Sequence, residues 1–238
     1  MDTQASIPKT IHYCWFGKNP KPKLVQECIA SWKKHLPSFS IKEWNESNYD
    51  VSKHPFTARM YTEKKWAFVS DYARLEILSS HGGIYLDTDM EIVSDISPLL
   101  SCELLLGKET NETISAGMIG AIPHHPYIVA CKEKYNNVHA TPPTIPRLIT
   151  SVYNDMKERF TNTIVCEPIA FYPYSPETIA SYKKSDLTPR TYGVHLWNYS
   201  WGHPALRFLN QFSLYHASKR LLTALGLKSA IKKLLRLS

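Results

Sequence analysis

The sequence predicts an α/β fold built around a mainly parallel sheet. Strand-like and helix-like segments alternate from the start of the chain, and this order favours parallel strands over a β-sandwich. The 238 residues, of which 43% are hydrophobic and 12% aromatic, are enough for one substantial domain with a buried core. The same composition excludes a disordered chain.

Each element is predicted from the spacing of its apolar residues. Short apolar runs indicate strands, and apolar residues three and four apart indicate helices. The Gly82-Gly83 pair is expected to end the second helix, because glycine adopts positive φ without a steric penalty. In chain order, the segments are strand 11–16, helix 23–35, strand 41–44, helix 65–80, strands 84–87, 90–93 and 117–122, helices 127–136 and 145–160, and strand 163–166.

The net charge of +7 comes from the C-terminal part of the chain. Eight basic residues and no acidic residue follow Asp186, whereas the rest of the chain carries 20 basic and 21 acidic residues. We therefore predict a catalytic domain over 1–215 and a basic amphipathic helix over 216–238. Such a helix suits an anionic membrane surface, although packing on the domain with a solvated basic face is the alternative. No nucleic-acid recognition motif accompanies the charge, so nucleic acid is not an expected partner.

The five cysteines are an odd number, widely spaced, and contain no Cys-x-x-Cys pair. This pattern encodes neither a disulfide framework nor a zinc site, and it indicates a reducing compartment. No apolar run resembles a signal peptide in the first twenty residues or reaches the length of a membrane span. We expect a cytoplasmic protein that is peripheral on the inner face of the plasma membrane.

Asp87 and Asp89 form an acidic pair directly after an apolar strand. If the strand continues through them, their side chains point to the same side, and a divalent cation would relieve their repulsion. Carboxylate oxygens favour Mg²⁺ or Mn²⁺ over zinc. A solvated surface pair is the alternative, but the carboxyl end of a strand is where open α/β sheets bind ligands.

Asp71 and Arg74 are three residues apart and share a face of the 65–80 helix. They form either an ordinary ion pair on a wet surface or part of a site. Because the helix leads through Gly82-Gly83 into the strand before Asp87, we expect the two pairs to converge. Asp71 would then accept hydrogen bonds from sugar hydroxyls, and Arg74 would offset negative charge.

Five motifs in this order resemble the DXD-containing, sugar-binding glycosyltransferases of family 32. That family includes bacterial capsule and surface polysaccharide transferases and fungal initiating mannosyltransferases. The resemblance implies a GT-A fold with a mixed, mainly parallel sheet, a nucleotide-sugar donor, a divalent metal and retention of anomeric configuration. The motifs are IPKTIHYCWFG at 7–17, SW at 31–32, WN at 44–45, SDYAR at 70–74 and GGIYLDTD at 82–89; EP at 167–168 and FYP at 171–173 are also similar.

The resemblance also implies roles for individual residues. Asp71, Arg74, Asp87 and Asp89 would be catalytic, with Asp87 and Asp89 as metal ligands and the first three also binding the donor. Further donor-binding residues would be Trp15, Phe16, Tyr85, His195, Ser200 and Trp201. Trp15 would stack on the nucleobase, although a core aromatic is the alternative. The segment 195–201 would close over the pyrophosphate, or else it is a cluster of ordinary core aromatics.

The sequence thus predicts a hexosyltransferase that uses Mn²⁺ or Mg²⁺ and a nucleotide-sugar, with a UDP-sugar preferred. The expected acceptor is a glycan, or a lipid-linked oligosaccharide of a bacterial surface polysaccharide. Two alternatives are a phosphohydrolase that uses the Asp-x-Asp pair and a non-catalytic glycan-binding protein. For a nucleophile the sequence offers only candidates of the right type, namely Glu109, Glu112 and Glu167.

Overall fold

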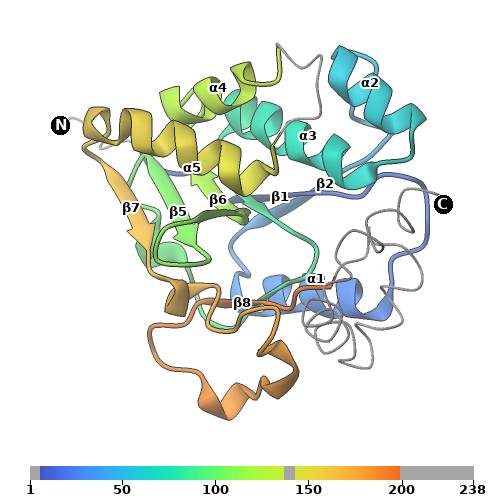
Figure 1. Cartoon of the computed structure of the whole chain (residues 1–238). Coiled ribbons are helices and arrows are strands. Elements are labelled where there is room, and N and C mark those ends of the chain that lie inside the picture. Colours follow the sequence, from blue (N-terminus) through green and yellow to red (C-terminus); the bar gives the residue numbers. More distant parts are fainter. Residues whose placement is uncertain (1–5, 137–142, 199–238) are drawn as a thin grey trace, which may run out of the picture. The chain divides into compact units, whose positions relative to one another are not determined.

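The structure is a computed structural model that describes residues 6–136 and 143–198 (Figure 1). The chain divides into two compact units, one of residues 1–173 and 183–196 and the other of residues 174–182 and 197–238. The predicted tail helix at 216–238, together with Ser200 and Trp201, lies outside the described residues. Within the described residues, no helix is both long and apolar enough to span a bilayer.

The first unit is built on a six-stranded sheet with the order β2-β1-β3-β6-β5-β7 (Figure 1). Strand β6 runs antiparallel to both of its neighbours, while the other three pairings are parallel. The mixed, mainly parallel sheet is therefore confirmed. The bounds are β1 Thr10–Cys14, β2 Ser40–Trp44, β3 Gly83–Leu86, β5 Leu104–Lys108, β6 Ile114–Ala121 and β7 Thr163–Cys166.

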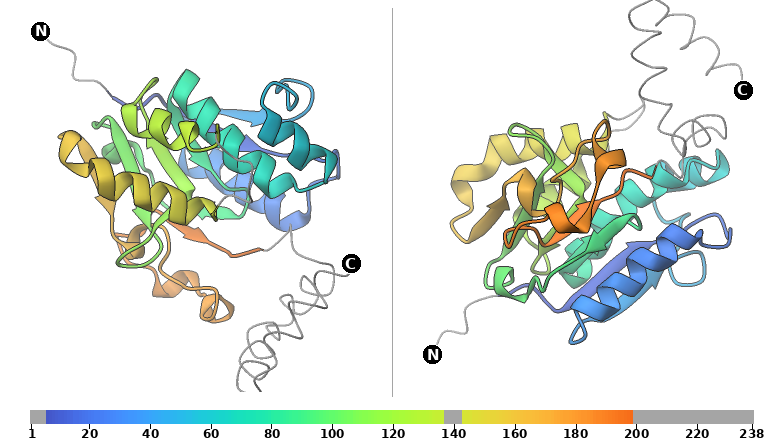
Figure 2. Two further views of the ribbon diagram at one scale, coloured as in Figure 1. Left: turned by 45° about the horizontal axis from the view of Figure 1, so that its top comes forward. Right: turned by 90° about the horizontal axis from the view of Figure 1, so that it is seen from below.

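Helices cover both faces of this sheet. Figures 1 and 2 show α3, α4 and α5 on one side and α1 on the other, where a two-stranded sheet of β4 and β8 also lies. Both faces are thus shielded, and β3 and β6 are buried along their whole length. The bounds are α1 Lys23–His35, α2 Pro55–Thr62, α3 Trp66–His81, α4 Pro126–Glu133, α5 Ile145–Met156, β4 Met90–Ile92 and β8 Gly193–His195.

The junction between α3 and β3 is built as the glycine pair predicts. Gly82 has φ 62° and Gly83 has φ 91°, values that favour glycine. A Cβ on Gly83 would lie 2.6 Å from the carbonyl oxygen of Thr10 and 2.9 Å from Nε2 of His12. The chain therefore turns directly from the helix into the sheet, and this junction fixes the end of α3 relative to the start of β3.

Three elements are absent from the sequence prediction. Helix α2 is short, and β5 is a short apolar run whose periodicity does not distinguish strand from helix. Strand β8 has three residues and exists only through its antiparallel pairing with the distant β4. The five cysteines are unpaired, as their spacing indicated.

Candidate active site

Asp87 and Asp89 lie in a turn, so the prediction that the strand continues through them is wrong. Strand β3 ends at Leu86, and the amide of Met90 donates to the carbonyl of Asp87 at 3.0 Å. The Asp87 amide donates to Gly117 and the Asp89 carbonyl accepts from Leu196, at 2.8 and 2.9 Å. The turn, held by these bonds on both sides, brings the two carboxylates together where an extended strand was expected to do so.

Arg74 is the centre of the charged cluster, and its side chain is only 5% exposed. One terminal nitrogen lies 3.1 Å from a carboxylate oxygen of Asp87, and the other lies 3.1 Å from Asp71. The guanidinium also donates to the Ala116 carbonyl at 2.7 Å and stacks on the Tyr85 ring, 4.5 Å from its centroid. The prediction that the two pairs converge is therefore confirmed, and the alternative of a wet surface ion pair is excluded.

The electrostatics of Asp71 reflect its largely buried position at the end of this cluster, where its side chain is 16% exposed. Burial raises the pKa of the Asp71 carboxyl to about 6, against the opposing effect of the nearby Arg74 guanidinium. The nearby charge of Asp87 raises the pKa further. A carboxylate in this setting gains strongly from added hydrogen-bond donors, such as the hydroxyl groups of a sugar.

His195 reaches the same place from the far end of the chain. Strand β8 pairs with β4 so that His195 lies opposite Met90, and its Nε2 atom lies 3.2 Å from Oδ1 of Asp89. Burial disfavours a charged ring, yet the pKa of His195 is raised because Asp89 lies so close. Ligand atoms of Asp87, Asp89 and His195 all lie within 4.8 Å of one another.

These three residues fit a divalent cation. A Cβ added at Gly117 would lie 3.1 Å from Oδ2 of Asp87, 3.0 Å from the Tyr172 hydroxyl and 3.7 Å from Nε2 of His195. The absence of a side chain at Gly117 therefore leaves space next to the ligand atoms. Two carboxylates with one imidazole suit Mn²⁺ better than Mg²⁺, because imidazole is the softer ligand.

Helix α1 fixes the turn from the other side. The indole nitrogen of the fully buried Trp32 donates to the Met90 carbonyl at 2.7 Å. The hydroxyl of Ser31 accepts from the Ile92 amide at 2.9 Å and donates to the Cys28 carbonyl at 2.6 Å. The Ser-Trp motif at 31–32 thus supports β4, the strand that follows Asp89.

The predicted donor-binding aromatics fall in different environments. Trp15 is half-buried rather than part of the core, and its indole donates to the Asn19 carbonyl at 2.7 Å, so its role on the nucleobase stays a prediction. Phe16 is 5% exposed and packs edge-on against Tyr49 in the core, and its role in donor binding also stays a prediction. The Tyr85 ring is 1% exposed and contacts Arg74, and its role in donor binding stays a prediction as well.

The three candidate nucleophiles differ in burial and in their distance from the charged cluster along the fold. Glu109 follows β5, is partly buried and interacts electrostatically with His195. Burial raises the pKa of Glu109, partly offset by His195 and Ser115. Glu112 is exposed, and Glu167 forms an exposed ion pair with Lys108 at 2.8 Å. Glu109 is thus the candidate that adjoins the site.

Sequence reasoning missed Ser115, Gly117 and Tyr172 as residues of this site. Ser115 and Gly117 belong to β6, the antiparallel strand, and its start lies beside the end of β3 because Leu86 pairs with Met118. Tyr172 lies in the FYP motif, which was noted only as a resemblance. The placement of Ser115 and Gly117 depends on strand pairing, which the order of elements does not specify.

The fold and the charged cluster define the class as a GT-A glycosyltransferase fold with a DXD-type acidic site. Residues 22–106 match the family described as "Glycosyltransferase sugar-binding region containing DXD motif". The matched region contains Asp71, Arg74, Asp87 and Asp89, and the match agrees with the resemblance to glycosyltransferase family 32.

Known relatives are similar to part of the chain. Human alpha-1,4-N-acetylglucosaminyltransferase is 32% identical over 155 residues, covering 58% of this chain and 44% of that protein. The mannosyl phosphorylinositol ceramide synthase CSH1 of Saccharomyces cerevisiae is 27% identical over 130 residues, covering 52% of this chain and 34% of that protein. The rat lactosylceramide 4-alpha-galactosyltransferase is 26% identical over 153 residues, covering 55% and 40%. The chain therefore spans less than half the length of these relatives.

Two solved structures share the fold. The PaToxG glycosyltransferase superposes with a TM-score of 0.54 at 20% identity, covering 64% of this chain and 71% of that one. The apo form of the glycosyltransferase GlyE from Streptococcus pneumoniae TIGR4 gives 0.50 at 12% identity, covering 93% and 64%. At these identities the likeness concerns the fold alone.

Proposed function

We propose that the protein is a metal-dependent, retaining glycosyltransferase that moves a hexose from a nucleotide-sugar, preferably a UDP-sugar, to a glycan acceptor. The observation that carries this proposal is the buried Arg74, which holds Asp71 and Asp87 on either side, 3.1 Å away in each case. This cluster adjoins Asp89 and His195 within the region that matches the sugar-binding family. One site therefore combines groups suited to a sugar with groups suited to a diphosphate and its cation.

Each residue has a distinct part in the proposed reaction. Asp71 binds hydroxyls of the donor sugar, and Arg74 fixes both carboxylates while offsetting negative charge. Asp87, Asp89 and His195 would hold a cation, which when bound neutralises charge on the departing diphosphate. Glu109 is our candidate for a carboxylate on the acceptor side of the sugar, because it is partly buried and interacts electrostatically with His195 of the cluster.

The acceptor and the location are further parts of the proposal. Two of the similar proteins are named for ceramide glycolipids, which supports a lipid-linked glycan as acceptor. The C-terminal part of the chain is basic and contains no acidic residue after Asp186. This composition supports binding to an anionic membrane surface on the cytoplasmic side. We propose a bacterial surface polysaccharide intermediate, such as a capsule precursor, as the acceptor in that setting.

A donor screen tests the proposed activity. The full chain is incubated with Mn²⁺ and a panel of UDP- and GDP-sugars, and slow release of nucleotide is measured in the absence of acceptor. We expect hydrolysis of one donor, and a loss of about 100-fold or more in Asp89→Asn, the scale of losing one electrostatic stabiliser. Asp95→Asn is the matched control, because Asp95 is exposed and lies six residues further along the chain.

The same assay separates the alternatives. Release of phosphate from simple monoesters would favour the phosphohydrolase, against which Asp87 already stands as a poor nucleophile because it is engaged by Arg74. Donor hydrolysis that is equal in Asp89→Asn and Asp95→Asn would contradict the proposed site. Absence of hydrolysis with every donor would favour a non-catalytic glycan-binding protein.

A further inference from the structure

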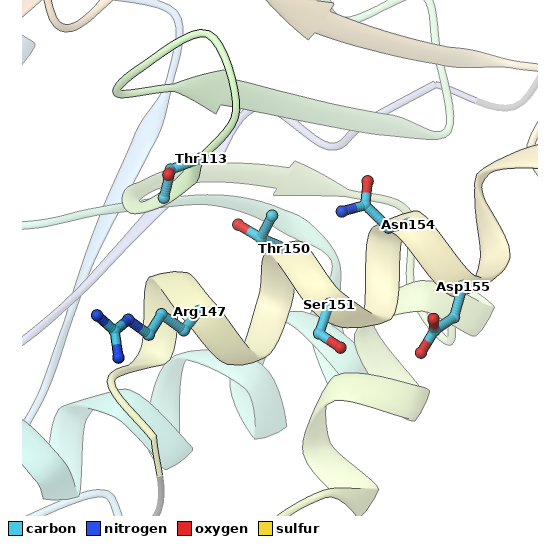
Figure 3. A pocket seen from close by; sticks show the side chains of 6 residues that line it. All are labelled: Thr113, Arg147, Thr150, Ser151, Asn154 and Asp155. Carbon is cyan, nitrogen blue, oxygen red and sulfur yellow. The ribbon is translucent and has the colours of Figure 1, made fainter.

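A polar groove lies beside α5, outside the charged cluster. It has a volume of about 450 Å³, is shallow and open to solvent, and lies within the first unit (Figure 3). Figure 3 shows one wall from α5 and the other from the hairpin between β5 and β6, which supplies Thr113. The side chains that line it are Thr113, Arg147, Thr150, Ser151, Asn154 and Asp155.

The groove is fixed at its base while its rim carries unused polar groups. The hydroxyl of Thr150 accepts from the Ile114 amide at 3.0 Å, which ties α5 to the start of β6. Arg147, Ser151, Asn154 and Asp155 have no side-chain hydrogen bond or ion pair within residues 6–136 and 143–198. The rim therefore offers hydrogen-bond donors and acceptors together.

The hairpin connects this groove to the charged cluster. The amide of Glu109 donates to the Thr113 carbonyl at 2.9 Å, while the Glu109 carboxylate interacts electrostatically with His195. From Thr113, β6 runs to Gly117, which borders the ligand atoms of Asp87 and His195. Four residues of strand span about 13 Å, which exceeds the length of one hexose ring.

We propose that this groove binds the distal sugars of an oligosaccharide acceptor whose terminal sugar lies at the charged cluster. This inference rests on the proposed glycosyl transfer and extends it to the class of acceptor. Sugar hydroxyls both donate and accept hydrogen bonds, as the mixed side chains of the rim do. A shallow groove more than one ring away from the transfer site selects a chain of several sugars over a single sugar.

The test uses the full chain and two tryptophan variants. Ser151→Trp fills the groove from an exposed position on α5, and Glu133→Trp places the same side chain at an exposed position on α4 as the control. Binding is measured on an array of neutral and acidic glycans from one to six sugars long, with Mn²⁺ and UDP present. Hydrolysis of UDP-sugars without acceptor is measured on the same samples.

We expect wild type and Glu133→Trp to retain oligosaccharides of three or more sugars and not monosaccharides. Ser151→Trp should lose this retention by about tenfold or more, the effect expected when a bulky side chain occupies a site, while its donor hydrolysis stays unchanged. Equal retention by both variants, or no retention of any oligosaccharide by wild type, would overturn the proposal. If wild type hydrolyses no donor but still loses oligosaccharide retention in Ser151→Trp, the proposed transferase activity is refuted and the proposed binding groove is supported.

Discussion

The two ends of strand β3 are built in opposite ways. At its start, the buried His12 donates through Nε2 to the Gly82 carbonyl at 3.0 Å, and its Nδ1 accepts from the Trp44 indole at 3.1 Å. Both polar atoms of that ring are satisfied by neutral partners. Its end leads to the carboxylates of Asp87 and Asp89, together with Arg74 and His195.

The difference shows how the fold supports a site whose buried charges oppose folding. Buried charges are tolerated only when they are paired and fixed, and like charges in close contact oppose folding. The neutral, fully bonded start of β3 holds the strand and α3 in register, so that Arg74 meets both of its carboxylates. One end contributes stability and position, and the other is available for ligands.

Substitution of Arg74, at the charged end of β3, should have the largest effect on activity. Arg74→Lys keeps the charge but not the planar fork that reaches Asp71, Asp87 and the Ala116 carbonyl together. We expect donor hydrolysis to fall by about 100-fold or more. The measurement is kcat/KM for nucleotide release, with urea unfolding alongside.

The matched control is Arg59→Lys, because Arg59 is exposed on α2. It should behave like wild type in both measurements. If Arg74→Lys hydrolyses the donor as fast as wild type, the site at the end of β3 does not depend on the planar guanidinium of Arg74.

Lowering the pH should have a smaller effect, on the stability that His12 contributes at the start of β3. Burial lowers the pKa of His12 to about 4 from the ordinary 6.5, so as pH falls the unfolded chain takes up a proton first. The stability from this residue is complete above about pH 6.5 and declines toward pH 4. Between pH 7 and 5, wild type should lose about 2 kcal/mol more unfolding free energy than His12→Gln, which cannot titrate.

Urea unfolding at the two pH values measures this difference. Other groups, including Asp71 with its raised pKa, titrate in both proteins, so their contributions cancel in the comparison. Equal losses in wild type and His12→Gln would mean that His12 does not remain neutral between Trp44 and Gly82.

Much of the fold and the heart of the site could be predicted from local pattern. The helix at 23–35 and the strand at 163–166 were predicted at their observed bounds, since the first has apolar residues at helical spacing and the second is a short, mostly apolar run. The meeting of Asp71 and Arg74 with Asp87 followed from the Gly-Gly junction. Gly117 could not be predicted, because it reaches the site through the pairing of β6 with the distant β3. Tyr172 lies in no strand, and nothing in the local pattern places its hydroxyl beside Gly117.

Binding of Mn²⁺ tests the central claim most directly, namely that the end of β3 holds a cation together with the donor's diphosphate. Free Mn²⁺ is measured by electron paramagnetic resonance during titration of wild type, Asp89→Asn and Asp95→Asn, with and without UDP. We predict one site in wild type and in Asp95→Asn, tightened by UDP, and a loss of about tenfold or more in Asp89→Asn. Equal Mn²⁺ affinity in all three proteins, with no effect of UDP, would contradict the account.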